Sequence, residues 1–148
     1  MMSQTPSQTV GPYFGFALPY DEGPLVVPED HPDVIELRGR LLDGAGEPVS
    51  DALLEICQPG LFGRCETGAD GSYRFRTARP ADYLPLLIFA RGLLKPVWTR
   101  VYLTAEAPFP AEVDPARRRT LVAAPEGERA YRFDVRLQGD GETVFFAY

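Results

Sequence analysis

From residue 34 onward, apolar and polar residues alternate along much of the chain. The pattern is clearest near the C-terminus, where four apolar side chains are spaced two apart and polar ones separate them. The apolar positions are Tyr131, Phe133, Val135 and Leu137, and the polar ones are Arg132, Asp134 and Arg136. Residues 73–76 show the same alternation. A period of two is typical of a strand with one face in a core and the other in solvent.

Apolar runs and segments rich in β-branched and aromatic residues predict further strands. The segments are residues 34–41, 52–57, 84–90, 97–104 and 143–146, and the run at 84–90 indicates a fully buried central strand. Clusters of Gly and Asp at residues 43–46, 68–71 and 138–141 have the composition of turns. About eight or nine short strands without a long helix predict an all-β fold, a two-sheet β-sandwich.

Residues 1–33 differ from the rest of the chain. They contain six prolines and show neither a helical nor a strand period, which predicts an extended N-terminal arm. The arm also carries Tyr13, Phe14, Phe16 and Tyr20, and aromatic rings are costly to leave in water. We therefore expect two regions: an arm over residues 1–33 that packs on a partner chain, and a β-sandwich domain over residues 34–148.

Length and charge narrow the class of protein. A chain of 148 residues is the size of one domain. Its net charge of -6 argues against nonspecific nucleic-acid binding, and the basic run at residues 117–119 is expected in a solvated strand start or loop. No apolar run reaches the roughly 18 residues of a membrane span, and the N-terminus has no secretory pattern. These features predict a cytoplasmic protein without a membrane-spanning segment.

Residue types alone indicate no catalytic or metal site within this chain. The single histidine, His31, lies in an acidic loop bounded by proline, where a surface position is expected. Cys57 and Cys65 are eight positions apart, which fits neither a zinc pair nor a disulfide framework and predicts two buried thiols. Neither a nucleophile elbow nor a phosphate-binding loop occurs. The composition favours a protein that supplies a surface to something else.

Several segments, taken in order, carry a family resemblance. They are residues 5–13, 54–58, 62–64, 89–92, 99–102, 118–121 and 131–146. Their sequences resemble those of the intradiol ring-cleaving dioxygenases, and most closely the α subunits of those that act on protocatechuate. The resemblance implies a β-sandwich with extended arms. It also implies insertion of dioxygen between the two hydroxylated carbons of a catechol, which would convert protocatechuate to 3-carboxy-cis,cis-muconate.

The same resemblance implies that Fe(III) is bound elsewhere. The family's iron-binding chains hold the metal with two Tyr and two His, and alignment on the turn at residues 90–92 puts Tyr83 and Pro85 at the two histidine positions. Proline cannot ligate a metal, and the loop at residues 59–61 lacks the family's first tyrosine. We therefore expect a homologous iron-binding β subunit as partner in a hetero-oligomer, and no metal in this chain.

For this chain the resemblance implies a share in the pocket for a small aromatic substrate. The family's α arm crosses the mouth of the partner's active site, so the corresponding pocket residues here are Thr9, Gly11, Pro12 and Tyr13. Arg91 would direct a cation toward the substrate's carboxylate, the group that distinguishes protocatechuate from catechol.

Two other interpretations stay open at this point. Residues 43–49 and 70–80 are also similar to transthyretin-like and peptidase-associated sandwich domains, which would make the chain a stand-alone binding module without metal. An aromatic arm could also be exchanged between copies of one chain, as in a self-assembling structural protein.

Overall fold

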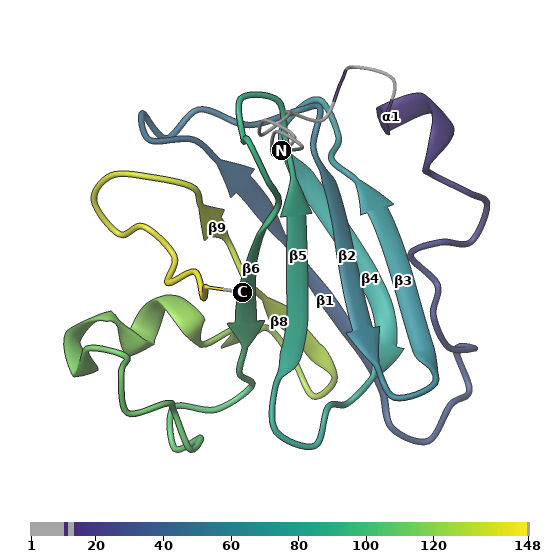
Figure 1. Cartoon of the computed structure of the whole chain (residues 1–148). Helices are drawn as coiled ribbons and strands as arrows, with labels where there is room; N and C mark the ends of the chain where they lie inside the picture. Colours follow the sequence, from purple (N-terminus) through teal and green to yellow (C-terminus); the bar gives the residue numbers. More distant parts are fainter. Residues whose placement is uncertain (1–10, 12–13, 148) are drawn as a thin grey trace, which may run out of the picture.

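Two β-sheets face each other and form the body of the protein (Figure 1). The computed structural model describes residue 11 and residues 14–147. One sheet contains β1 (Val34–Leu42), β4 (Ser72–Ala78), β7 (Ala124–Pro125), β8 (Ala130–Arg132) and β9 (Val135–Arg136). The other has the order β3 (Leu61–Glu66), β2 (Leu53–Gln58), β5 (Leu84–Phe89) and β6 (Val97–Val101). The predicted two-sheet β-sandwich is confirmed.

The main core lies between the two sheets. Leu37 and Phe75 reach it from the five-stranded sheet, and Leu54 and Leu86 from the four-stranded sheet, and all four are fully buried. β5 is central as predicted, because it pairs with both β2 and β6. It is not fully buried, however. Its residues alternate between buried and half-buried, so the outer face of this sheet keeps some exposure.

The C-terminal alternation is correct, but it does not form one strand. Tyr131, Phe133 and Val135 are buried, as the period of two requires. β8 and β9 are separate because the side chain of Asp134 takes part in the pairing: its Oδ1 accepts a hydrogen bond from the backbone N–H of Arg40 at 2.9 Å. A side-chain acceptor at this point interrupts the backbone ladder with β1.

Residues 143–146 were expected to form a strand and do not. Phe146 makes an isolated bridge with Trp98, and its N–H donates to the Trp98 carbonyl at 3.0 Å. Just past the end of β6, the Tyr102 N–H donates to the Leu121 carbonyl, and the Ala123 N–H donates to the Tyr102 carbonyl, each at 2.8 Å. The edge of the four-stranded sheet at β6 is therefore covered by segments from the last third of the chain.

The basic run at residues 117–119 lies in a 3₁₀ helix, η1 (Pro115–Leu121), and not in a loop or strand start. Asp114 caps this helix, since its Oδ1 accepts from the Ala116 N–H at 2.8 Å. Proline at the first helical position suits the start, because its missing N–H would be unsatisfied there anyway. Leu121 is fully buried and belongs to a second hydrophobic cluster with Tyr102 and Val113.

The described part of the arm is not extended throughout, because it contains a short helix and, further along, turns such as the one at residues 21–24. Residues 14–17 form a short helix, α1 (Phe14–Ala17), which Figure 1 shows on the side of the molecule where β3 lies. Further along, the arm follows its own sandwich: Gly23 accepts from the N–H of Arg64, and Val26 donates to Arg76. None of the described helices is long and apolar enough to cross a membrane.

Candidate functional site

Arg91 lies in the turn that follows β5. The next residue, Gly92, has a φ of +86°, a conformation that glycine adopts without strain. The guanidinium of Arg91 pairs with the carboxylate of Asp51, and the two side chains are 67% and 35% exposed. An ion pair this exposed contributes about 0–1 kcal/mol, so a competing carboxylate can replace Asp51 at little cost. The structure thus presents Arg91 as an accessible cation.

Of the four arm residues predicted to line the pocket, Gly11 is the one that the structure describes. Its carbonyl accepts a hydrogen bond from the Phe14 N–H at 3.3 Å, just ahead of α1. A Cβ atom at this position would meet nothing within 4 Å, so packing within this chain does not require glycine there. Thr9, Pro12 and Tyr13 lie outside the described residues. Among those described, no hydrogen bond or ion pair joins Gly11 to Arg91.

Tyr83 and Pro85, at the family's two histidine positions, lie at the start of β5. Pro85 is opposite Arg100 of β6 in the antiparallel register. The guanidinium of Arg100 lies 4.6 Å from the centre of the Tyr83 ring. These residues do not fit an iron ion, because proline offers no ligand atom and a guanidinium repels a cation. Elsewhere in residues 14–147, no three His, Cys, Asp or Glu side chains are grouped so as to hold a metal.

His31 and the two cysteines take part in no such group. The Nδ1 atom of His31 accepts from the backbone N–H of Asp33 at 3.2 Å, a local turn contact on a half-buried ring. The prediction of two buried thiols is wrong: both cysteines are free, Cys57 is exposed and Cys65 is half-buried. Cys57 falls on the outer face of β2, opposite Phe62. Burial raises the pKa of the Cys65 thiol, which makes it a poorer nucleophile.

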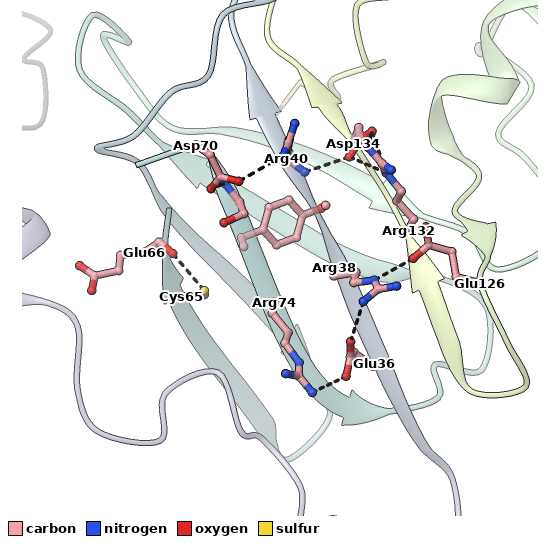
Figure 2. Close-up of a pocket in the computed structure, with 13 residues that line it drawn as sticks. Glu36, Arg38, Arg40, Cys65, Glu66, Asp70, Arg74, Glu126, Arg132 and Asp134 are labelled. Carbon is pink, nitrogen blue, oxygen red and sulfur yellow. Dashed lines mark hydrogen bonds and ion pairs between the residues drawn. The ribbon is translucent and has the colours of Figure 1, made fainter. Parts of the chain in front are cut away.

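A charged surface, which sequence reasoning did not single out, covers the outer face of the five-stranded sheet. A hollow of about 570 Å³ lies on this surface, and Figure 2 shows the side chains that line it. Arg74, Arg38 and Arg132 stand in register on β4, β1 and β8, and like charges in such positions destabilise a sheet. Carboxylates lie between them. Glu36 pairs with Arg74 at 2.5 Å, and Glu126 with Arg38 at 2.7 Å.

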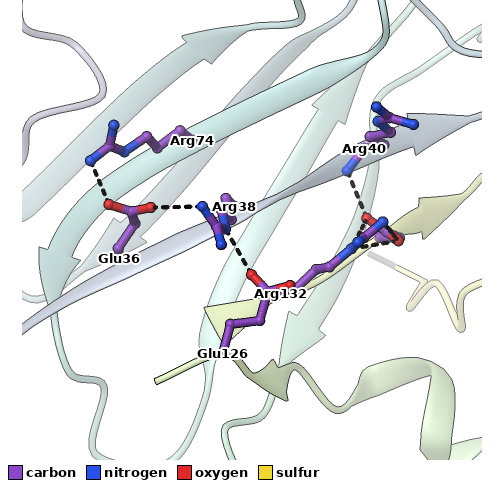
Figure 3. Close-up of polar contacts among 7 residues, drawn as sticks. Glu36, Arg38, Arg40, Arg74, Glu126 and Arg132 are labelled. Atoms are coloured by element: carbon purple, nitrogen blue, oxygen red, sulfur yellow. Dashed lines mark hydrogen bonds and ion pairs between the residues drawn. The ribbon is translucent and has the colours of Figure 1, made fainter. Parts of the chain in front are cut away.

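The pairing continues across the sheet, as Figure 3 shows. Arg132 pairs with Asp134 at 2.8 Å, and Arg40 with Asp70 at 3.2 Å. The hydrogen bond from Arg38 to Glu126 raises the pKa of Arg38. The sequence signal was the alternation of Glu36, Arg38 and Arg40 along β1. Each of these arginines has an opposite charge beside it, so the ion pairs offset the repulsion between the guanidinium groups that stand in register.

Comparisons with known proteins place the chain in a family. No protein-family model matches it. It is 37% identical to a protocatechuate 3,4-dioxygenase alpha chain of Burkholderia cepacia, over 98% of each chain. It is 33% identical to the protein of the same name in Pseudomonas putida, over 100% of this chain and 98% of that one. The chain belongs to the family of protocatechuate 3,4-dioxygenase alpha chains. The expectation of an enzyme subunit from the intradiol dioxygenases is thereby confirmed.

The comparisons also bear on loop length and fold. The alignment with the first alpha chain spans 193 positions, more than the 148 residues of this chain, so that relative carries segments that are absent here.

Among solved structures, a dioxygenase domain from Streptomyces sp. SirexAA-E matches with a TM-score of 0.65 and 24% identity over 93% of this chain and 99% of that one. Catechol 1,2-dioxygenase of Acinetobacter sp. ADP1 matches with a TM-score of 0.57 and 20% identity, over 80% of this chain and 58% of that one. These likenesses support the fold. Membership of the alpha chain family favours the dioxygenase interpretation over a stand-alone binding module.

Proposed function

We propose that this chain is the alpha subunit of a protocatechuate 3,4-dioxygenase and works only with a homologous iron-binding β chain. The reaction would break the ring bond between the two hydroxylated carbons of protocatechuate. Both atoms of one dioxygen would enter the product, 3-carboxy-cis,cis-muconate. The observation that carries this proposal is the similarity to two alpha chains over essentially the whole length. A cytoplasmic location is part of the same proposal.

The β chain, in this proposal, holds the Fe(III). The support within this chain is the chemistry at the two family histidine positions, Tyr83 and Pro85. One phenol and a proline cannot provide four ligands, and Arg100 already holds a positive charge over the Tyr83 ring. An iron-binding partner would supply the missing ligand set.

The alpha chain would contribute to the substrate pocket of the β chain. Arg91 would bind the carboxylate of protocatechuate, since a guanidinium forms two parallel hydrogen bonds with that group. Its exposure and its weak pairing with Asp51 leave it accessible to such a ligand. The arm over residues 1–33 would pack on the partner, with Thr9, Gly11, Pro12 and Tyr13 at the mouth of the pocket.

Co-expression tests this function. A tagged copy of the chain would be produced together with a homologous chain that retains the two-Tyr, two-His set, and the complex would be assayed for iron and for oxygen consumption with protocatechuate. We expect an iron-containing complex that consumes one dioxygen per protocatechuate, and no activity from the tagged chain alone. A tagged chain that purifies without its homologue and leaves the homologue's activity unaffected would overturn the proposal.

A further inference from the structure

Arg100 has an environment unlike that of the other arginines described above. It lies on the edge strand β6, on the outer face of the four-stranded sheet, and three aromatic rings surround its guanidinium. The ring centres of Tyr83, Trp98 and Phe146 lie 4.6, 5.5 and 4.5 Å from it. Cation–π contacts of this kind attract the guanidinium, but a ring offers its N–H groups no lone pair, so these groups can still donate to a ligand.

One N–H group of Arg100 lacks an acceptor. The Nε atom of Arg100 is buried without a hydrogen-bond partner, and no carboxylate of the described residues lies within ion-pair distance. Arg64 provides the contrast. Its half-buried guanidinium sits on the same sheet and donates to Glu55 at 2.8 and 2.5 Å. A buried donor without an acceptor is costly, and in a native protein it commonly marks a water, an ion or a ligand.

Two more buried groups without partners lie along the same row of rings. The Tyr102 hydroxyl is one, on a side chain only 1% exposed, and the Nε of Arg118 is the other. The Tyr102 ring centre is 5.6 Å from that of Tyr83 and 4.6 Å from that of Phe109, and the guanidinium of Arg118 lies 5.7 Å from the Phe109 ring. Because three buried groups without partners lie along one row of aromatic rings, the missing acceptor at Arg100 is not an isolated irregularity.

A hollow of about 480 Å³ opens beside Arg100. Its apolar walls come from Trp98, Val113, Val144 and Phe146, and its volume lies within the range of small-molecule sites. Arg117 also lines it but already pairs with Glu142 at 3.5 Å, which leaves Arg100 as the cation available to a ligand.

We propose that this hollow binds a small aromatic carboxylate. The carboxylate would accept hydrogen bonds from the guanidinium edge of Arg100, and the ring would pack on Trp98 and Phe146. Glu112 and Asp114 line the same hollow and are exposed, so they disfavour a second negative charge on the ligand. The ligand class is therefore a benzoate-like monoanion. The proposal concerns residues of this chain only, and its failure would leave the proposed function standing.

Binding at this site can be followed by the fluorescence of a tryptophan of the chain itself. Trp98 is the single tryptophan in the sequence, and its ring touches the guanidinium that would bind the ligand. The experiment titrates the full chain with benzoate and follows Trp98 fluorescence, with isothermal titration calorimetry as a second measurement. Benzamide, which has the same shape without the charge, is the matched ligand. We expect saturable binding of benzoate, and at least tenfold weaker binding of benzamide.

Two variants and a control complete the test. Arg100→Met should weaken benzoate at least tenfold, whereas Arg129→Met, which alters an exposed arginine, should bind like the parent. Glu112→Gln should bind benzoate more tightly, because it removes a nearby negative charge at an exposed position. Equal affinity for benzoate and benzamide, or no saturable signal in either measurement, would overturn the proposal. The comparison of the two ligands on the unmodified chain holds even if Arg100→Met fails to fold.

Discussion

The backbone of Gly39 passes so close to Phe133 that a Cβ atom at position 39 would lie 1.9 Å from the Phe133 carbonyl oxygen. The contact lies between the part of β1 that pairs with β8, residues 36–38, and the part that pairs with β9, residues 41–42. The Phe133 N–H donates to the neighbouring Arg38 carbonyl at 2.8 Å. A side chain at position 39 would force the two backbones apart at the point where the sheet changes its pairing from β8 to β9.

Gly39→Ala should therefore destabilise the protein strongly. We expect a loss of about 3 kcal/mol or more in the free energy of unfolding, at the upper end of the cost of overpacking, because backbone and not a flexible side chain must move. Urea unfolding followed by circular dichroism would measure it. Gly15→Ala is the control, since a Cβ there meets nothing within 4 Å and should change stability by less than about 1 kcal/mol. A similar small change in both variants would contradict the argument.

Tyr73 should make the stability sensitive to alkaline pH. Its hydroxyl donates to the Phe133 carbonyl at 2.5 Å, and burial raises the pKa of Tyr73 well above 10. The neutral phenol therefore adds stability that is complete below the unfolded pKa of about 10. That stability falls as pH rises above it, because only the unfolded chain releases the proton.

Tyr73→Phe should weaken this pH dependence. At neutral pH we expect a loss of about 1–2 kcal/mol, because the Phe133 carbonyl loses its donor. Between pH 9 and 11, roughly one unit on either side of the unfolded pKa, the free energy of unfolding should fall less steeply than in the parent. Tyr20→Phe alters an exposed ring and serves as control. Parallel pH curves for the parent and Tyr73→Phe would show that Tyr73 is not the titrating group.

Arg64 should hold the arm against the sandwich. Its guanidinium pairs with Glu55 and donates to the Leu18 carbonyl at 2.8 Å, while its backbone N–H donates to Gly23. Arg64→Met removes the first two contacts and keeps most of the side-chain volume. We expect faster hydrogen exchange and proteolysis over residues 17–23, with strands β1 and β4 unchanged. Arg129→Met is the matched control, and equal protection in the two variants would mean that other contacts hold the arm.

Strands were predicted correctly where burial of every second residue in the core produces a period of two. They were predicted wrongly where pairing with distant segments decides whether a strand forms. Tyr131, Phe133 and Val135 alternate because every second residue faces the same core. Residues 143–146 have a strand's composition, but after Thr143 the segment leaves β9 and crosses to β6, where only Phe146 pairs. Helix α1 has four residues, too few to leave a helical period in the sequence.

The surroundings of Arg100 could not be predicted from its neighbours in the sequence. The segment at residues 99–102 carried part of the family resemblance, but it gave Arg100 no role. The rings around Arg100 come from positions 83, 98 and 146, which only the pairing of β5, β6 and the C-terminal segment brings together. Cys57 was misjudged for a related reason. It lies in an apolar run, but its register places it on the outer face of the sheet.

Arg91 gives the last prediction, which concerns substrate selection in the assembled enzyme. If its guanidinium binds the substrate's carboxylate, Arg91→Ala in the complex should raise the KM for protocatechuate by about ten- to a hundredfold, corresponding to about 1.5–3 kcal/mol for a charged hydrogen bond. It should leave kcat largely unchanged, since binding is lost without a change in the reacting atoms. Arg91→Lys should recover part of the loss, because an ammonium keeps the charge without the paired N–H geometry.

The control for this prediction is a substrate without the carboxylate. Any turnover of catechol should respond little to Arg91→Ala, since the group that Arg91 would bind is missing. Arg79→Ala would be the matched variant, an arginine whose guanidinium lies 5.4 Å from the Tyr131 ring, and it should keep the parent's KM. Unchanged steady-state kinetics in Arg91→Ala would remove Arg91 from the pocket and leave the arm as the contribution of this chain.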